Sequence, residues 1–205
     1  MRAVIIGNGS MNDYGYIKGK INKSDYIICA DGGYKHCKAL GIKPAVLIGD
    51  MDSIGDNDYD GEIINLPIRK DFTDSEVCIK FILLKDFEEI LMFGFIGTRM
   101  DHTVTNILLL KQIAEAGKKA HIIDEHNDIM IAGTENIIYG KKGDLISIIP
   151  VSGNLCGVTT NGLSYPLSDE TLVLGESRGV SNFMTSNKCQ ININSGMGII
   201  VKARD

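Results

Sequence analysis

Aspartates recur beside glycines in the first half of the chain, at spacings that would suit a metal ion. Asp50 and Asp52 are separated by one residue, so in an extended segment both carboxylates lie on the same face. Two carboxylates held together repel each other unless a cation neutralises them or one takes up a proton. Mg²⁺ prefers a few carboxylates together with water and phosphate oxygens, and Asp74 would supply a third carboxylate. These residues predict a magnesium-dependent site of phosphate transfer.

Positively charged residues accompany the acidic series. Lys70 and Arg99 are cations, and the planar guanidinium of Arg99 suits bidentate binding of phosphate. Carboxylates, cations and glycines together indicate a nucleotide-triphosphate site, in which metal binding and positioning do most of the catalysis. For the general base, Asp101 is the first candidate and His102 the second, since imidazole titrates in the useful range.

The elements that would position these residues alternate between strands and helices. Apolar runs without polar alternation are typical of parallel strands covered on both faces. They occur at residues 2–6, 26–30, 45–48, 62–66, 90–93 and 120–123. Helical stretches lie near residues 34–40, 75–85 and 102–116. This alternation predicts an open, mostly parallel, Rossmann-like α/β sheet within residues 1–125.

Each polar cluster follows the carboxyl end of a predicted strand. Asp31 follows the second strand, Asp50 the third, residues 70–74 the fourth and Arg99 the fifth. In open α/β sheets this edge is where ligands bind. Glycines in the same turns let the backbone approach a ligand closely. We therefore expect the polar clusters to meet at one edge of the sheet.

Turn formation and helix capping explain some of these residues equally well. Asp and Gly are common turn formers, and we assign the acidic stretch 56–61 to a solvated loop. Thr73 and Glu76 have the spacing of a capping box, which gives Glu76 a structural role first. Asp101 would likewise N-cap the helix that follows, with His102 on its surface. Turn formation does not explain why carboxylates recur at a single edge.

Composition and absent motifs exclude several classes of protein. The formal net charge of -5 argues against nucleic acid or an anionic membrane surface as a partner. The sequence shows no apolar segment of membrane-spanning length and no signal peptide, and its five scattered cysteines indicate a reducing cytoplasm. It contains no P-loop and no protein-kinase signature. Gly7-Asn8-Gly9-Ser10 is only a fragment of a dinucleotide-binding fingerprint.

The pattern of predicted secondary structure changes after about residue 125. Short β-type runs occur at residues 145–150, 171–174 and 191–194, with Gly and Asn between them and no convincing helix. This pattern predicts an antiparallel sandwich or barrel of about 80 residues, a size within the range of autonomous domains. We therefore divide the chain into residues 1–125 and 126–205.

Taken in order, the polar clusters resemble the thiamine pyrophosphokinase family. The first part carries Ala30-Asp31-Gly32-Gly33, Gly49-Asp50-Met51-Asp52-Ser53, Lys70-Asp71-Phe72-Thr73-Asp74 and Gly97-Thr98-Arg99-Met100-Asp101-His102. The second part carries Gly162-Leu163-Ser164-Tyr165-Pro166-Leu167 and Gly179-Val180-Ser181-Asn182. The resemblance spans nearly the whole chain, and the ordered set is more specific than any one segment.

The resemblance implies an enzyme that transfers diphosphate from ATP to the hydroxyl of thiamine with Mg²⁺, giving thiamine diphosphate and AMP. It implies an α/β domain over residues 1–125 that binds ATP and Mg²⁺. It also implies a β-sandwich over residues 126–205 that binds thiamine. Members of the family are homodimers, so thiamine would lie between the catalytic domain of one chain and the sandwich of the other.

The same resemblance implies roles for individual residues. The metal ligands would be Asp50, Asp52 and Asp74. Substrate would be positioned by Arg99 and Asp101, and Lys70 and His102 would also bind it. Thiamine would be contacted at Ser181 and Asn182. Asp31 and Asp71 match active-site carboxylates without an assigned task.

Recognition of the acceptor would depend on aromatic residues of the second part of the chain. Some relatives place a tryptophan against thiamine, and this chain contains none. Tyr165 and Phe183 are the available aromatics, and either would face a cationic ring or pack in the sandwich core. Two alternatives stay open: a diphosphokinase for another acceptor such as a hydroxymethyl pterin, and a nucleotide- or thiamine-binding module without turnover.

Overall fold

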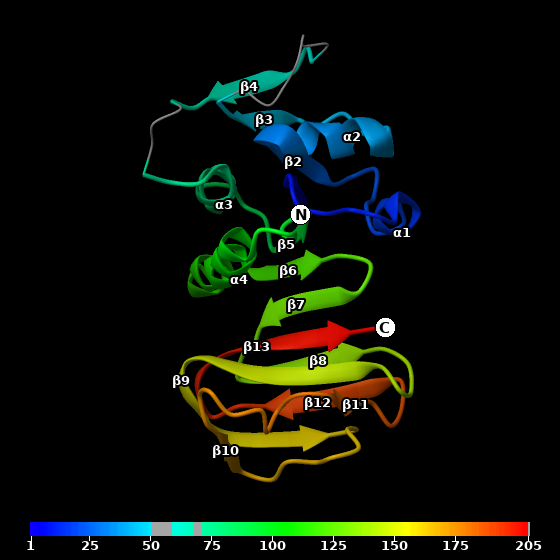
Figure 1. The fold of residues 1–205 in the computed structure, drawn as a ribbon, viewed down its shortest axis with the longest axis vertical. Helices are drawn as coiled ribbons and strands as arrows, with labels where there is room; N and C mark the ends of the chain where they lie inside the picture. The colour runs from blue at the N-terminus through cyan, green and yellow to red at the C-terminus, as the bar shows by residue number, and fades with distance from the viewer. Residues whose placement is uncertain (51–58, 68–70, 205) are drawn as a thin grey trace. The chain divides into compact units, whose positions relative to one another are not determined.

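The computed structural model describes residues 1–50, 59–67 and 71–204, which form two compact units, Met1–Glu125 and His126–Asp205. Asp52 and Lys70 of the predicted site lie outside the described residues. The mixed α/β class predicted from the sequence is confirmed (Figure 1). No helix among the described residues combines the length and apolar character needed to cross a bilayer.

The first unit is built on parallel strands. They are β1 (Arg2–Ile6), β2 (Tyr26–Ala30), β3 (Val46–Gly49), β4 (Glu62–Asn65), β5 (Glu89–Phe93) and β6 (Lys119–Ile123). Their order across the sheet is β4-β3-β2-β1-β5-β6, and every neighbouring pair is parallel. Each predicted strand overlaps one of these. β4 departs from the expectation of burial on both faces, because it is the edge strand and most of its side chains are exposed.

Helices connect the strands. They are α1 (Tyr14–Lys18), the short 3₁₀ turn η1 (Asp31–Gly33), α2 (Tyr34–Leu40), α3 (Asp74–Leu83) and α4 (Met100–Glu115). The sequence did not predict α1, which has only five residues and begins where the Asp13 carboxylate accepts a hydrogen bond from the backbone N–H of Tyr16. A left-handed Gly41 ends α2, as glycine commonly does after a helix. Strands β1, β2 and β3 are almost wholly buried beneath these helices.

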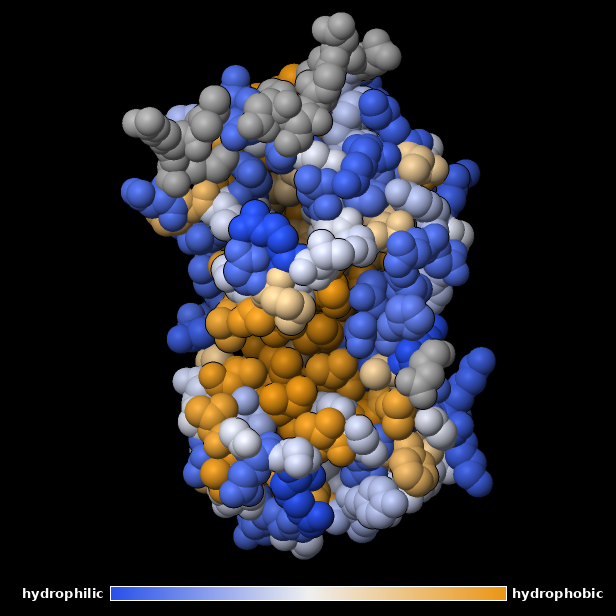
Figure 2. Space-filling model, viewed as in Figure 1, coloured by the Kyte–Doolittle hydropathy of each residue, from blue (hydrophilic) through white to orange (hydrophobic). Residues whose placement is uncertain are grey.

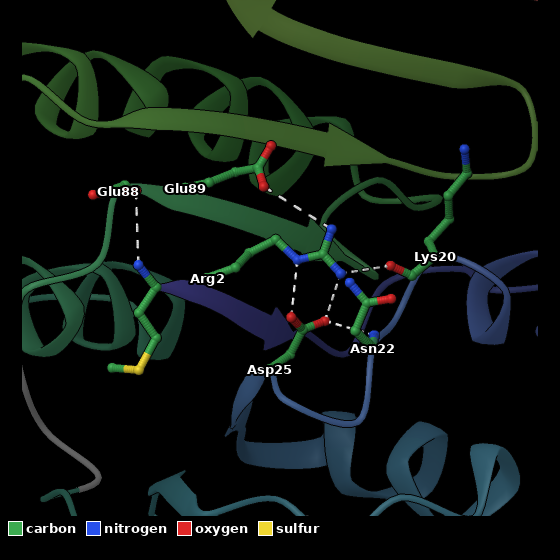
Figure 3. A network of polar contacts seen from close by, with 7 residues as sticks. Arg2, Lys20, Asn22, Asp25, Glu88 and Glu89 are labelled. Carbon is green, nitrogen blue, oxygen red and sulfur yellow. Dashed lines mark hydrogen bonds and ion pairs between the residues drawn. The ribbon is translucent and has the colours of Figure 1, made fainter.

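A network of charged residues joins the amino ends of the strands (Figure 3). The Arg2 guanidinium donates two hydrogen bonds to the Asp25 carboxylate, at 2.9 and 2.7 Å, and a third to the carbonyl of Lys20. Asp25 Oδ2 also accepts from the backbone N–H of Asn22, and Glu89 lies 4.0 Å from Arg2. The side chain of Asp25 is only 2% exposed, so this pair fixes the starts of β1, β2 and β5 from within the fold.

The described part of the second unit contains strands without helices, as the sequence predicted. The strands are β7 (Asn127–Ile131), β8 (Glu135–Tyr139), β9 (Leu145–Asn161), β10 (Glu170–Leu172), β11 (Asn182–Phe183), β12 (Lys188–Asn192) and β13 (Ser195–Ala203). All their pairings are antiparallel. β9 is 17 residues long and pairs in turn with β11, β13, β10 and β12. Gly153 and Gly157 have positive φ angles, which lets this long strand change direction.

Candidate active site

The carboxyl ends of β1, β2 and β5 surround a cavity of about 620 Å³ in the first unit. Asp31, Asp74, Arg99 and His102 all line it, so the structure brings together four of the residues predicted from strand-end positions. Asp50 directly follows β3, but Asp50, Asp71 and Asp101 are not among the described residues that line the cavity. The convergence follows from the parallel sheet, whose strands all present their carboxyl ends at one edge.

Glycines allow two loops to form the floor of this cavity. The N–H of Gly9 donates to the carbonyl of Gly94 at 2.7 Å, and the N–H of Ser10 donates to the carbonyl of Ile96 at 2.7 Å. A side chain at Gly9 would place its Cβ 2.4 Å from the Ile96 oxygen, so only glycine fits. The Gly7–Ser10 segment, a weak dinucleotide signal in the sequence, therefore has a packing role against the loop after β5.

Asp31 is strained and incompletely hydrogen-bonded. Its φ of 42° lies in the left-handed region, which non-glycine residues seldom occupy. Its Oδ1 is buried and has no hydrogen-bond partner among the described residues. Backbone strain and an unsatisfied buried oxygen both cost stability, and both are found most often at functional sites. A bound ligand can supply the partner that such an oxygen lacks. Asp31 therefore has the character of a ligand-binding carboxylate.

Asp74 is placed at the cavity by the start of α3. Thr73 is the N-cap, and its hydroxyl oxygen accepts the N–H of Glu76 at 3.2 Å. The Glu76 carboxylate forms an ion pair with Lys80 one turn later, at 2.9 Å. Thr73 therefore caps α3 as the spacing predicted, and the side chain of Glu76 forms an ion pair along the helix.

The first turn of α4 carries Arg99, Asp101 and His102. Arg99 is the N-cap residue and Asp101 lies inside the helix, so the prediction that Asp101 caps α4 is wrong. Arg99 instead makes two hydrogen bonds to Asp101, with Nη2 to Oδ2 at 2.6 Å and Nε to Oδ1 at 3.3 Å. These bonds, together with the backbone N–H of His102, lower the pKa of Asp101 to about 2.

The low pKa of Asp101 bears on the choice of general base. A carboxylate that protonates only near pH 2 has little tendency to take a proton from an alcohol at neutral pH. Asp101 also lies outside the described lining of the cavity, whereas His102 is part of it. Of the two candidates from the sequence, the geometry favours His102.

Long-range hydrogen bonds shape the cavity in ways that the sequence did not reveal. His36 is buried on α2, and its Nε2 lies 2.9 Å from the carbonyl of Gly9 while its Nδ1 lies 2.7 Å from the hydroxyl of Tyr14. Because a carbonyl only accepts, Nε2 carries the proton and Nδ1 accepts from Tyr14. Burial lowers the pKa of His36, which keeps the ring neutral. Asn106 of α4 similarly donates to the carbonyl of Phe95 at 2.8 Å.

The predicted acceptor residues of the second unit gather around one side chain. Asn182 Oδ1 accepts from the N–H groups of Tyr165 and Phe183, and Nδ2 donates to the carbonyl of Tyr165 at 2.6 Å. The rings of Tyr165 and Phe183 meet edge to face with centroids 5.7 Å apart, and Tyr165 is 62% exposed. Ser181 has a φ of 60° and is exposed. The amide of Asn182 makes three hydrogen bonds that hold the backbone of Tyr165 and Phe183 together.

Comparison with known proteins identifies both units. The model of the thiamin pyrophosphokinase catalytic domain matches residues 17–123, and that of the thiamin pyrophosphokinase vitamin B1 binding domain matches residues 121–200. The chain is 27% identical to thiamine pyrophosphokinase of Bacillus subtilis over 98% of both chains. It is 23% identical to thiamin pyrophosphokinase 1 of Caenorhabditis elegans, over 86% of this chain and 78% of the relative.

Solved structures share the fold over the whole length. The crystal structure of the Bacillus subtilis thiamine pyrophosphokinase matches with a TM-score of 0.91 and 25% identity over 100% of both chains. That of the thiamin pyrophosphokinase from Geobacillus thermodenitrificans matches with a TM-score of 0.88 and 21% identity, over 100% of this chain and 98% of that one. The chain belongs to the thiamin pyrophosphokinase family.

Proposed function

We propose that this chain transfers the diphosphate group of ATP to the hydroxyl of thiamine. The oxygen of the alcohol would attack the β-phosphorus, the bond between that phosphorus and the α,β-bridging oxygen would break, and AMP would leave. Membership of the family supports this reaction. The observation that carries it is the cavity at the carboxyl edge, where the carboxylates of Asp31 and Asp74 meet the cation of Arg99 and the imidazole of His102.

Mg²⁺ would be held by Asp50, Asp52 and Asp74. Within the described residues no three His, Cys, Asp or Glu side chains are grouped as they would be around a metal ion, and Asp52 lies outside that part of the chain. The site still fits a cation, because Asp31 and Asp74 both line the cavity and the buried Oδ1 of Asp31 has no hydrogen-bond partner among the described residues. When bound, Mg²⁺ would neutralise phosphate oxygens and orient them.

The remaining residues of the cavity would bind phosphate and move a proton. Arg99 would bind phosphate oxygens, with Asp101 fixing the plane of its guanidinium through two hydrogen bonds. His102 would accept the proton of the thiamine hydroxyl as the oxygen attacks. Lys70 and Asp71 keep the roles that the resemblance implies, substrate binding and an active-site carboxylate.

The second unit would bind the acceptor as a thiamine-binding β-sandwich. Support for a sandwich comes from β9, whose beginning pairs with β13 and whose end pairs with β12, so that one strand joins two groups. Tyr165 and Phe183 offer aromatic surface to the cationic thiazolium ring, and Ser181 offers a hydroxyl beside them. Asn182 would position this surface. The first unit would bind ATP and Mg²⁺.

A homodimer with the site at the subunit interface completes the proposal. Met100, Val104 and Leu108 recur at helical spacing on α4 and are 63%, 49% and 50% exposed. Figure 2 shows apolar residues gathered at the surface of this helix. Because Met100 stands between Arg99 and Asp101, a second copy covering this face would approach the site. In the cytoplasm the five free thiols would stay reduced.

Product analysis tests the proposed reaction. The protein is incubated with ATP, Mg²⁺ and thiamine, and AMP and thiamine diphosphate are measured by chromatography. Equal amounts of the two products are expected. A hydroxymethyl pterin in place of thiamine serves as the alternative acceptor, and faster release of AMP with the pterin would reject thiamine as the substrate. Ligand-induced thermal stabilisation without any AMP would indicate a binding module.

Sedimentation of the native chain tests the dimer. A Leu108→Glu variant places a charge on the exposed face of α4 and is expected to yield monomers, because burying an unpaired carboxylate in an interface is costly. Leu84→Glu is the matched control, since Leu84 is 88% exposed and lies outside α4. A monomeric wild type, or a Leu108→Glu variant that remains dimeric, would contradict this surface.

A further inference from the structure

Lys35 is a cation of the cavity that the motifs did not indicate. It is the second residue of α2, four positions after Asp31, and it lines the same cavity. The side chain is exposed, and within the described residues its ammonium forms no hydrogen bond or ion pair. An exposed lysine without a partner is usually a solvated surface group. What distinguishes Lys35 is its place on the wall of a cavity that would receive a polyanion.

The other described cation of the lining is already engaged. Arg99 makes two hydrogen bonds to Asp101. Its positive charge is therefore partly neutralised, and two of its N–H donors are already in use when a ligand binds. Lys35 keeps its whole charge and all three donors. A phosphate group would gain an interaction with Lys35 without breaking an existing one, whereas Arg99 must be shared with Asp101.

The backbone of Lys35 is held in place by its neighbour. His36 is buried and contacts the Gly9 carbonyl and the Tyr14 hydroxyl, which fixes α2 against the loop after β1. The flexible stem of Lys35 therefore extends from a rigid base. This arrangement suits a point charge that has to follow phosphate oxygens of varying position.

We propose that Lys35 binds phosphate oxygens of ATP and makes the site prefer the triphosphate over less charged nucleotides. The inference rests on the proposed function, because it assumes that ATP occupies this cavity. Replacing Lys35 by alanine removes a charge-assisted hydrogen bond and is expected to weaken ATP binding roughly tenfold. The rate constant of the transfer step should change much less, because the carboxylates, Arg99 and His102 remain.

A binding series with four ligands tests whether the role is directed at phosphate. Dissociation constants are measured with Mg²⁺ for a nonhydrolysable ATP analogue, ADP, AMP and adenosine. In Lys35→Ala the loss of affinity should be largest for the ATP analogue, smaller for ADP and AMP, and absent for adenosine. Lys35→Arg should restore most of the affinity. An equal loss for adenosine would overturn the proposal, because it would indicate a disturbed cavity.

A matched control lies on the same helix. Lys38 is also exposed, but its ammonium lies 5.1 Å from the ring centroid of Tyr34 and it does not line this cavity. Lys38→Ala should bind all four ligands like the wild type. Suppose that the wild type releases AMP and that Lys35→Ala has an unchanged KM for ATP. The role proposed for Lys35 would then be refuted, and the proposed function would be unaffected. If the wild type neither binds ATP nor releases AMP, both proposals fail.

Discussion

At the amino ends of the parallel strands, the guanidinium of Arg2 meets the buried carboxylate of Asp25, and each makes several hydrogen bonds. At the carboxyl ends of the same sheet, Asp31 has a strained backbone and a buried oxygen without a partner among the described residues, and Lys35 is a charge without an ion pair there. Both ends are charged, but among the described residues only the second combines a buried oxygen without a hydrogen-bond partner, at Asp31, with a lysine without an ion pair, Lys35. Charged groups that are paired with each other stabilise the fold. Charged groups that have no partner within the protein remain available to a ligand.

The largest expected effect is at Asp31. Asp31→Asn keeps the shape of the side chain and tolerates the left-handed φ, but it removes the charge. We expect kcat to fall by about 100-fold or more, as when a charge-stabilising group is lost from an active site. The melting temperature should stay equal or rise, because a buried carboxylate without a partner is costly. Steady-state kinetics and thermal denaturation measure the two.

A residue of the second unit provides the control for Asp31. Asp169 also has a positive φ, of 54°, but it is exposed. Asp169→Asn should retain wild-type kinetics. If both substitutions had the same small effect on kcat, the strain at Asp31 would be a property of a turn and not of a site.

The opposite result is expected at Arg2. Arg2→Ala leaves the nearly buried Asp25 carboxylate without its main partner, and the free energy of unfolding should fall by about 2 kcal/mol. Values of kcat and of KM for ATP at 25 °C should stay within about twofold of the wild type. The reason is that the substitution leaves the residues of the cavity unchanged in every molecule that is folded. Urea denaturation and kinetics on the same preparation check both. A large loss of activity without a loss of stability would contradict a purely structural role for the amino ends of the strands.

Asn106 tests whether the carboxyl end also contains satisfied structural groups. It is buried and donates to the Phe95 carbonyl in the loop after β5. Asn106→Ala should lower the free energy of unfolding by about 1–2 kcal/mol, because a buried carbonyl loses its partner. It should also raise KM for ATP moderately, since this loop lines the cavity. An effect on stability alone would assign Asn106 to the fold and not to the site.

The smallest effect concerns pH and His36. Burial lowers its pKa, so below the ordinary imidazole value of about 6.5 the unfolded chain binds more protons than the folded one. Wild-type stability should therefore fall as the pH drops below that value. In His36→Asn this part of the pH dependence should vanish, although the variant is less stable at neutral pH. Denaturation midpoints between pH 5 and 8 would show the difference, and parallel curves would contradict it.

The sequence predicted the sheet well because its signal is local. Residues 3–6 and 26–30 are continuous apolar runs, and the strands β1 and β2 that contain them have the predicted bounds, 2–6 and 26–30. Asp31, Asp74, Arg99 and His102 meet at one cavity because parallel strands share an edge. Turn and capping signals were weaker, so α1 was missed and Asp101 was wrongly assigned as a cap.

Contacts between distant residues were beyond the sequence patterns. His36 contacts Gly9 across 27 positions, and Asn182 contacts Tyr165 across 17. Neither pair has a spacing rule, because each depends on how separate loops pack in the folded chain. Sequence patterns did not indicate Lys35 for a similar reason. Lysine is common at protein surfaces, and only the folded structure shows that this one lines the cavity.

We infer that the carboxylates of this edge support magnesium-dependent transfer of a diphosphate group. The most direct test is the product ratio in wild type and in Asp74→Asn, measured with thiamine and ATP while Mg²⁺ is titrated. We predict AMP and thiamine diphosphate in equal amounts from the wild type, and in Asp74→Asn a rate lower by about 100-fold with a higher requirement for Mg²⁺. ADP with thiamine monophosphate as products, or an Asp74→Asn variant with wild-type rate and magnesium dependence, would contradict the account.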